Sequence, residues 1–356
     1  MTRKRLVHGV NRGQYDLAIL NTNLVNVLTG EIYPADIGIV GETIATASPA
    51  GKHKLSAQEI IVGDNLWAVP GFIDGHVHNE SSMCTPAHWT EVILPQGTTT
   101  VCTDPHEIGN VLGMEGVRYM LEASRGLPLD YYITVPSCVP AVPELETAGA
   151  VFTAQEVRKM LTWERTVAIA EAMDYLGLIN QQGKITPIVE TGHKAGVPIE
   201  GHAPGVMAKA LQAYLAATGP RGSDHESFMA EEMVQKVQSG MLVYARTSTF
   251  RNGMVAVAEA LENVNDARMF GMCTDDVMPN HLLEHGHMDF AIRSLIEQGV
   301  DPVRAVQMAT INVAQHYGFW GRGAVAPGWT ADIVLLSNLE EINAQYVIAN
   351  GKLVAE

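Results

Sequence analysis

The chain has 356 residues, of which 47% are hydrophobic and 17% are charged, a composition typical of a globular protein with a large core and a smaller second domain. This composition excludes an intrinsically disordered chain. The formal net charge of −16 argues against binding to nucleic acid or to an anionic membrane surface, because both would require clustered Lys and Arg, and it favours a small neutral or cationic ligand.

The N-terminal segment does not have the pattern of an export signal. Residues 2–5 are basic, but no apolar stretch of signal-peptide length follows them, and no run in the sequence has the length of a membrane span. We therefore expect a cytoplasmic protein with no membrane partner. The four cysteines lack Cys-x-x-Cys spacing, which predicts reduced core residues rather than disulfides or a cysteine-bound zinc: Cys84, Cys102, Cys138 and Cys273.

Both ends of the chain have the pattern of short strands. Between residues 15 and 69, apolar segments at 16–20, 35–40 and 59–62 alternate with turn residues. The segment after Gly328 has the same texture, with apolar segments at 331–336 and 346–349 and the turn Asn350-Gly351. We expect the two ends, residues 1–69 and 322–356, to pack together as one small β-sandwich domain.

Residues 70–321 alternate between strand-like and helical segments. Helix starts are indicated by the capping box of Thr153 and Glu156 and by the cap Asp301 followed by Pro302. Eight such units over about 250 residues match a TIM-type (β/α)8 barrel, so the predicted fold class is α/β. The predicted strands cover residues 71–78, 98–104, 131–137, 166–171, 198–202, a short run that ends at His225, 241–248 and 269–275.

The pair His76 and His78 ends the first predicted strand. Side chains two residues apart on a strand point to the same side, so these imidazoles can hold one cation together. In a TIM barrel the active site lies at the C-terminal ends of the strands. A single polar residue there is more often a hydrogen-bonded structural residue than a ligand, but six at equivalent strand ends predict a metal site: His76, His78, Glu171, His202, His225 and Asp275.

Several motifs resemble a known family. Residues 70–78, Pro-Gly-Phe-Ile-Asp-Gly-His-Val-His, resemble the first-strand motif of the amidohydrolase superfamily. Five later segments resemble adenine deaminases of the bacterial and archaeal type, and the resemblance extends from about Tyr15 to the C-terminus. These segments are 79–83 (Asn-Glu-Ser-Ser-Met), 103–108 (Thr-Asp-Pro-His-Glu-Ile), 201–205 (Gly-His-Ala-Pro-Gly), 223–226 (Ser-Asp-His-Glu) and 273–276 (Cys-Thr-Asp-Asp).

The resemblance implies a centre of two divalent metal ions. Four histidines would bind the ions: His76, His78, His202 and His225. Glu171 would bridge them, at a position where many members of the wider superfamily use a carboxylated lysine and adenine deaminases are known for a glutamate. Carboxylate and imidazole ligands suit Mn²⁺, Fe²⁺ or Zn²⁺. The family favours manganese or iron, with zinc as the alternative.

The implied reaction is the deamination of adenine to hypoxanthine and ammonia by a metal-bound hydroxide, a step of purine salvage. Asp275 lies where barrel hydrolases place the carboxylate that takes the water proton and returns it to the leaving ammonia. Glu80 is expected either to protonate N1 of the purine or to orient a histidine. Asp276 is expected either to accept a hydrogen bond from the purine or to cap a helix. Three residues at the end of the second strand are expected to shape the substrate pocket: Asp104, His106 and Glu107.

Two features leave other functions open. Adenine deaminases usually carry a further C-terminal domain, whereas this chain stops at Glu356, so we expect either a compact variant or a truncation. Residues near the presumed rim, such as Asn79 and Val277, also depart from the family pattern. The alternatives are an amidohydrolase acting on another purine or on a cyclic amide, and a catalytically idle metal-binding or regulatory protein. A homo-oligomer is a family-level expectation.

Overall fold

The computed structural model describes residues 3–143 and 145–356. The chain has a mixed α/β fold and groups into two compact units. The first unit comprises Met1–Ile73, Thr90–Thr100 and Gly286–Glu356, and the second comprises Asp74–Trp89 and Val101–His285. The predicted domain boundaries, at residues 69/70 and 321/322, stay a prediction.

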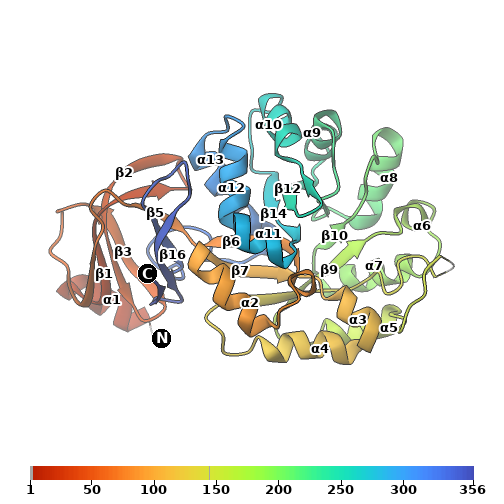
Figure 1. The fold of residues 1–356 in the computed structure, drawn as a ribbon, viewed down its shortest axis with the longest axis horizontal. Coiled ribbons are helices and arrows are strands. Elements are labelled where there is room, and N and C mark those ends of the chain that lie inside the picture. The colour runs from red at the N-terminus through yellow and green to blue at the C-terminus, as the bar shows by residue number, and fades with distance from the viewer. Residues whose placement is uncertain (1–2, 144) are drawn as a thin grey trace. The chain divides into compact units, whose positions relative to one another are not determined.

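In the first unit, strands from both chain ends join in one sheet, drawn in red and dark blue in Figure 1. The strand order is β18-β17-β16-β5-β1-β2-β3, and β4 pairs with β1. The pairing of the two ends was expected, whereas their packing as a sandwich stays a prediction. The strands are β1 (Gln14–Asn26), β2 (Glu31–Val40), β3 (Thr43–Pro49), β4 (Ser56–Val62), β5 (Trp67–Pro70), β16 (Ile333–Leu336), β17 (Ala344–Ala349) and β18 (Lys352–Ala355).

A tight turn and an N-terminal helix accompany this sheet. Asn350 and Gly351 have φ angles of 48° and 76°, the left-handed conformation that a tight hairpin between β17 and β18 requires. The helix α1 (Arg3–Arg12) was not predicted, because its sequence is short and mostly polar. Its Leu6 packs against a small core cluster that includes Tyr15.

Each of the eight predicted strand segments of residues 70–321 overlaps a strand of the structure. They are β6 (Phe72–His78), β7 (Thr98–Thr103), β8 (Asp130–Val135), β9 (Thr166–Ala172), β10 (Ile199–Gly201), β11 (Ser223–Asp224), β12 (Leu242–Ser248), and the two pieces β14 (Phe270–Cys273) and β15 (Asp275–Asp276). One sheet has the order β10-β9-β8-β7-β6-β15, and another joins β11, β12 and β14, with the short β13 (Arg251–Asn252) beside β12. A parallel bridge between Ile199 and Gly222 links the two sheets.

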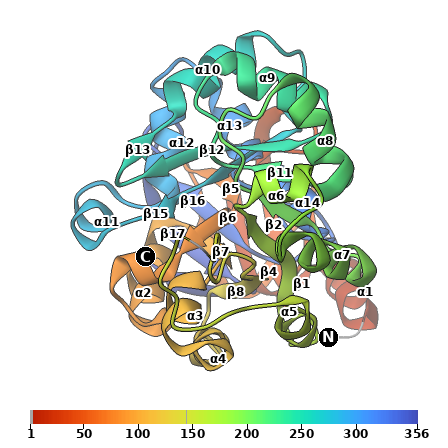
Figure 2. The ribbon, with the colours of Figure 1, turned by 90° about the vertical axis from the view of Figure 1, so that its right-hand side faces the viewer.

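Helices follow most of these strands, and in Figure 2 α4, α5, α7, α8, α9 and α10 lie around the outside of the strands of the second unit. They are α2 (Pro86–Ile93), α3 (His106–Leu112), α4 (Met114–Ala123), α5 (Ala154–Met160), α6 (Tyr175–Ile179), α7 (Ile185–Ala195), α8 (Ala208–Thr218), α9 (Ala230–Gln238), α10 (Met254–Glu262) and α11 (Pro279–His285). The first unit contains α12 (Met288–Ile296), α13 (Pro302–Met308) and α14 (Ile311–Tyr317). Short 3-10 turns cover Asn79–Ser82 and Leu94–Gln96.

Both helix starts predicted from capping residues are found. Thr153 and Glu156 form a capping box at α5, and the Asp301 side chain accepts a hydrogen bond from the backbone N–H of Arg304 at the start of α13. Within residues 3–143 and 145–356, no helix has the length and apolar character needed to cross a membrane.

In the sheet of the first unit, one buried residue of the strand β4 lies between exposed neighbours. Ile61 of β4 is 7% exposed and belongs to a buried cluster with Leu17 and Ile19 of β1, whereas its neighbour Ile60 is 50% exposed. Successive side chains of a strand point to opposite faces, so one isoleucine fills the core and the other faces out.

Ile61→Ala and Ile60→Ala therefore form a matched pair. We expect Ile61→Ala to lower the free energy of unfolding by about 2–5 kcal/mol, because it removes buried methyl groups and leaves a cavity. Ile60→Ala should cost less than about 1 kcal/mol. Urea unfolding of both variants measures the difference, and equal losses would contradict the assigned register of β4.

Candidate metal centre

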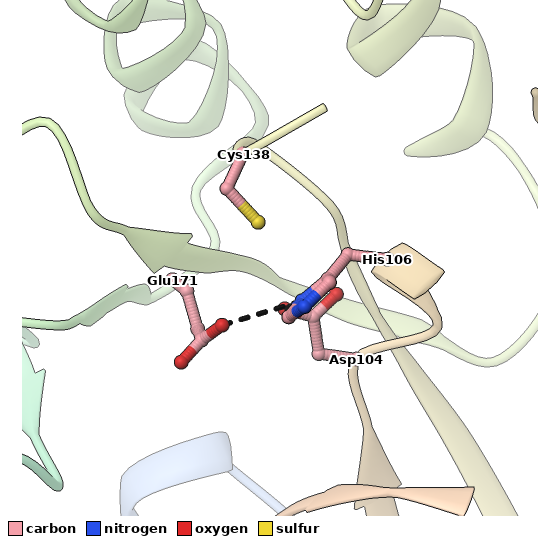
Figure 3. Close-up of side chains that lie close together, drawn as sticks. All are labelled: Asp104, His106, Cys138 and Glu171. Atoms are coloured by element: carbon pink, nitrogen blue, oxygen red, sulfur yellow. Dashed lines mark hydrogen bonds and ion pairs between the residues drawn. The ribbon is translucent and has the colours of Figure 1, made fainter. Parts of the chain in front are cut away.

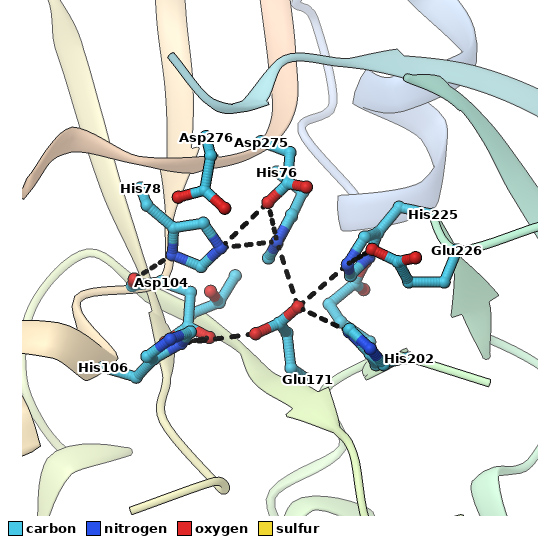
Figure 4. Close-up of polar contacts among 12 residues, drawn as sticks. His76, His78, Asp104, His106, Glu171, His202, His225, Glu226, Asp275 and Asp276 are labelled. Atoms are coloured by element: carbon cyan, nitrogen blue, oxygen red, sulfur yellow. Dashed lines mark hydrogen bonds and ion pairs between the residues drawn. The ribbon is translucent and has the colours of Figure 1, made fainter. Parts of the chain in front are cut away.

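Glu171, near the end of β9, lies at the middle of a cluster of histidines (Figure 4). Its side chain is buried, and its Oε1 is 2.8 Å from Nε2 of His225, 3.1 Å from Nδ1 of His202 and 3.5 Å from Nε2 of His76. Its Oε2 faces the other way, 3.3 Å from Nδ1 of His106. One carboxylate therefore contacts histidines that follow or lie on four different strands.

A second group lies beside Glu171, where β6 and β15 end together. The Nε2 atoms of His76 and His78 are 3.1 Å apart, and Oδ1 of Asp275 is 3.1 Å from Nε2 of His78 and 3.7 Å from Nε2 of His76. The parallel pairing of β15 with β6 places Asp275 opposite Val77. All six residues predicted as metal ligands are thus brought together in the second unit of the chain.

The backbone around Asp275 is held by Asp74. The Asp74 carboxylate accepts hydrogen bonds from the backbone N–H of His76, from the backbone N–H of Thr274 and from the Thr274 hydroxyl. It thereby ties β6 to the start of β15. Asp275 itself has a φ of 60°, a conformation that costs a non-glycine residue on the order of 1–3 kcal/mol and that is common at functional sites.

The arrangement fits a cation better than it fits hydrogen bonds alone. The Nδ1 atom of His78 faces the backbone carbonyl oxygen of Asp104 at 2.9 Å, so Nδ1 is the donor and, in the neutral ring, Nε2 carries the lone pair. That lone pair faces Nε2 of His76. The Nε2 atom of His225 is buried 2.8 Å from Glu171 without hydrogen-bond geometry to any described residue. Nitrogens that converge on carboxylates in this way are typical of a metal centre.

The electrostatics agree with this arrangement. Burial by itself lowers the pKa of His76, but contacts with Asp275 and Glu171 raise it to about 10. Burial by itself raises the pKa of Glu171, but four histidines hold it well below its usual range. The pKa of Asp275 is likewise held well below its usual range, by His76 and His78 against the effect of burial. The carboxylates of Glu171 and Asp275 are therefore ionised at neutral pH.

Glu80 and Asp276, two of the remaining predicted residues, lie at the same edge. Oε1 of Glu80 accepts a hydrogen bond from the backbone N–H of Ile108, and its Oε2 is buried with no hydrogen-bond partner in the described chain. Asp276 accepts a hydrogen bond of 2.5 Å from the hydroxyl of Ser81.

The three predicted pocket residues after β7 are also close to the cluster. Nδ1 of His106 is 2.9 Å from Oδ2 of Asp104. Oε1 of Glu107 lies 3.5 Å both from Nδ1 of His78 and from Nε2 of His106. These residues thus lie against both His78 and Glu171.

Three further residues belong to the cluster and were not among the predicted site residues: Arg246, Glu226 and Cys138. Arg246 on β12 donates hydrogen bonds to Glu226 and to Asp275. Cys138, which was interpreted as a core residue, has its thiol beside Asp104, His106 and Glu171. Arg246 could have been found by the strand-end rule that located the ligands. Cys138 follows β8 by a few residues and gave no comparable signal.

Three solved structures superpose on nearly the whole chain. Atrazine chlorohydrolase from Arthrobacter aurescens, solved with zinc, has a TM-score of 0.69 at 15% identity and covers 96% of this chain and 95% of its own. Phenylurea hydrolase B has a TM-score of 0.68 at 17% identity, over 95% and 96%. An adenosine deaminase from Xanthomonas campestris with bound zinc has a TM-score of 0.67 at 12% identity, over 96% and 93%. At these identities the likeness shows a shared fold.

Parallel strands that end in an imidazole–carboxylate cluster define an α/β protein with a candidate metal centre. Residues 67–354 match the model of the amidohydrolase family, and the chain belongs to this family. The resemblance inferred from the motifs is thereby confirmed.

Curated relatives are more similar in sequence than the solved structures. An adenine deaminase from Thermosipho africanus is 41% identical over 344 residues, and one from Klebsiella pneumoniae is 40% identical over 357 residues. These matches cover 96% and 99% of this chain but 58% of each relative. The chain therefore spans somewhat more than half the length of the curated relatives that it matches.

Glu171→Gln keeps the shape of the side chain and removes its charge. Because this carboxylate contacts four imidazoles, we expect the affinity for Mn²⁺ to fall at least about tenfold. Titration of the metal-depleted chain, with elemental analysis of bound manganese, measures the loss. Glu190→Gln, at an exposed position of α7, is the control and should bind as the parent chain does. Unchanged affinity in Glu171→Gln would contradict the ligand role.

Proposed function

We propose that the protein is an adenine deaminase, which hydrolyses adenine to hypoxanthine and ammonia in purine salvage. The observation that carries the proposal is the Glu171 cluster, in which a buried glutamate lies between histidines that would bind the two ions. The two curated relatives described above are named adenine deaminase, and this supports the choice of substrate. Since the chain spans 58% of those relatives, the activity is proposed for this chain and has to be measured on it.

The residues fit a centre of two divalent ions. His76, His78 and Asp275 would hold one ion, His202 and His225 the other, and Glu171 would lie between them. A divalent metal ion, when bound, lowers the pKa of water to about 7 and so supplies a nucleophile at neutral pH. The oxygen and nitrogen ligands support Mn²⁺ or Fe²⁺, with Zn²⁺ as the alternative.

Asp275 would serve as the base that takes the proton of the attacking water and passes it to the leaving ammonia. Its depressed pKa keeps it ionised and able to accept a proton. Arg246 supports this role, because its bonds to Asp275 and Glu226 fix the direction of the carboxylate.

Glu80 would protonate N1 of the purine as water adds to C6. Its Oε1 accepts a hydrogen bond from the backbone N–H of Ile108, and its Oε2 has no hydrogen-bond partner in the described chain, which supports proton donation over the alternative of orienting a histidine. Burial and the charge of Glu107 raise its pKa to about 7, so that Glu80 carries a proton when Asp275 does not. When the surroundings raise the pKa of one carboxyl group and lower that of another, the first typically acts as the acid and the second as the base.

Four polar residues would complete the substrate pocket: Asp104, His106, Glu107 and Asp276. Asp276 would face the imidazole edge of the purine, steadied by Ser81. This position supports substrate contact over the alternative of a helix cap, because the Asp276 carboxylate bonds to a hydroxyl of the Asn79–Ser82 turn.

We also propose that the strands close into a (β/α)8 barrel and that the sheet of the chain ends folds into a β-sandwich. The parallel pairing of β15 with β6 and the bridge between Ile199 and Gly222 support closure. The cytoplasm would keep the four cysteines reduced. We further expect that the binding partner is a small-molecule substrate and that copies of the chain associate with one another.

A metal analysis combined with a turnover assay tests the proposed function. The purified chain is loaded with Mn²⁺, bound metal is counted, and ammonia release is followed with adenine, N6-substituted adenines and guanine, beside a cyclic-amide hydrolysis assay. Two bound ions and ammonia from adenine are expected. Turnover of another purine or of a cyclic amide alone would reassign the substrate, and metal binding without any turnover would favour an idle metal-binding protein.

Asp275→Asn tests the base. The amide can still offer an oxygen to a metal ion but cannot accept the proton, so we expect bound metal to be retained and kcat to fall at least about 100-fold. Asp266→Asn, at an exposed position, should leave kcat unchanged. Normal turnover by Asp275→Asn would reject the role.

Glu80→Gln tests the acid through the pH profile. A pKa raised to about 7 means that Glu80 is protonated below that pH and ionised above it, so kcat/KM with adenine should fall as pH rises through about 7. The variant should be about 10²–10⁴-fold slower and should lose this limb of the profile. Glu115→Gln, exposed on α4, is the control. A limb that persists in Glu80→Gln would assign the titration to another group.

A further inference from the structure

A second cluster of ligand-type side chains lies on the other side of Glu171 from its three histidine contacts. Asp104, His106, Cys138 and Glu171 each direct one ligand atom into it, and these atoms lie within 4.8 Å of one another (Figure 3). The cluster uses Oε2 of Glu171, whereas Oε1 faces His76, His202 and His225. It also contains a sulfur atom, which the predicted two-ion centre does not.

Hydrogen bonds within the protein leave this cluster incompletely satisfied. Nδ1 of His106 lies 2.9 Å from Oδ2 of Asp104 and 3.3 Å from Oε2 of Glu171, with the Cys138 thiol also alongside. One nitrogen carries at most one proton, so it cannot donate a full hydrogen bond to all of them. Oδ1 of Asp104, on a side chain that is 0% exposed, has no hydrogen-bond partner in the described chain.

The backbone holds Cys138 in this position. The hydroxyl of Ser137 donates to the backbone oxygen of Glu171 at 2.6 Å. The ammonium of Lys184 donates to the backbone oxygens of Ser137 and Val139, at 3.2 Å and 2.8 Å, on either side of Cys138. The thiol is therefore preorganised beside Glu171, and only small movements are needed for a shared ion, since zinc holds sulfur at about 2.3 Å and nitrogen or oxygen at about 2.0–2.2 Å.

We propose that Asp104, His106, Cys138 and Oε2 of Glu171 form an additional site for a thiophilic divalent ion, Zn²⁺ or Cd²⁺, whose occupation inhibits the enzyme. Thiolate ligands select softer ions than carboxylate and imidazole ligands do, so this site and the predicted two-ion centre prefer different metals. The bound ion replaces the thiol proton, which leaves to solvent. The side chain of His106 is 24% exposed and gives the ion a way in.

Inhibition follows from the residues that the ion would occupy. Asp104 and His106 are proposed pocket residues, and Glu171 is the proposed bridge. An ion held by all three would take up part of the substrate pocket and draw charge from Glu171. The inhibition rests on the proposed function, whereas binding of the additional ion does not.

The test adds Cd²⁺ to the Mn²⁺-loaded full chain and counts both metals after free ions are removed. We expect one equivalent of cadmium without release of manganese, together with the ultraviolet absorption of a cadmium–thiolate bond. Cys138→Ser and Cys138→Ala should lose the absorption and the extra equivalent, and should raise the inhibitory Cd²⁺ or Zn²⁺ concentration at least about tenfold. Cys84→Ser, which removes the most accessible of the four thiols, should behave as the parent chain does.

Three outcomes would overturn the site: absorption that persists in both Cys138 variants, no additional cadmium, or release of one manganese for each cadmium bound. Circular dichroism confirms that each variant is folded. Metal counts and absorption need no substrate, so a chain that binds cadmium through Cys138 but turns over no adenine would reject the proposed function and retain the site.

Discussion

The buried carboxylate of Glu171 is the interaction on which the rest of the candidate centre depends. A carboxylate removed from water loses several kcal/mol of solvation, which only positive charge or hydrogen-bond donors can offset. Around one oxygen the compensation comes from His76, His202 and His225, and at the other from His106. These histidines come from β6 and from the segments after β10, β11 and β7. Glu171 therefore constrains where four strand ends lie, and the loops that follow them have to support that placement.

A buried lysine supplies much of that support, at a distance from the chemistry. Nζ of Lys236 on α9 donates to the backbone oxygen of Ala203, to Asp224 and to Glu232, at 2.8, 2.9 and 2.7 Å. Asp224 in turn accepts a hydrogen bond from the N–H of Ala203, and Glu232 accepts one from the N–H of Gly205. Ala203 follows His202 and Asp224 precedes His225, so one ammonium ion holds both histidine-bearing segments in register. Breaking such a buried network leaves uncompensated charges, which makes the placement of the two histidines rigid.

The sequence predicted the strand ends well because each strand ends where an apolar run meets a polar residue, and this is a local pattern. His76 and Asp275 were located in this way, and so were Glu171 and the other predicted ligands. Cys138 could not be assigned a role on the same grounds, because its part in the cluster depends on which strands become neighbours. Local composition also gave no reason to link Lys236 with the loops that follow β10 and β11. The distribution of apolar residues thus predicts the framework, whereas hydrogen bonds between distant segments decide which of its polar residues cooperate.

The charge balance of the cluster explains why protons and metal ions compete there. Carboxylates outnumber the fixed cations among the residues described, and Arg246 offsets only part of the charge of Glu226 and Asp275. The histidines respond by taking up protons: the pKa of His76 is raised to about 10, and that of His78 lies well above its usual range. A protonated imidazole has no lone pair for a metal, so each ion that binds must release protons. The same reasoning applies to the thiol cluster, where an ion would replace the protons of His106 and Cys138. If both sites bind ions, each draws on the charge of Glu171, so filling one would weaken the attraction of the other for its ions and the single carboxylate would couple the two occupancies.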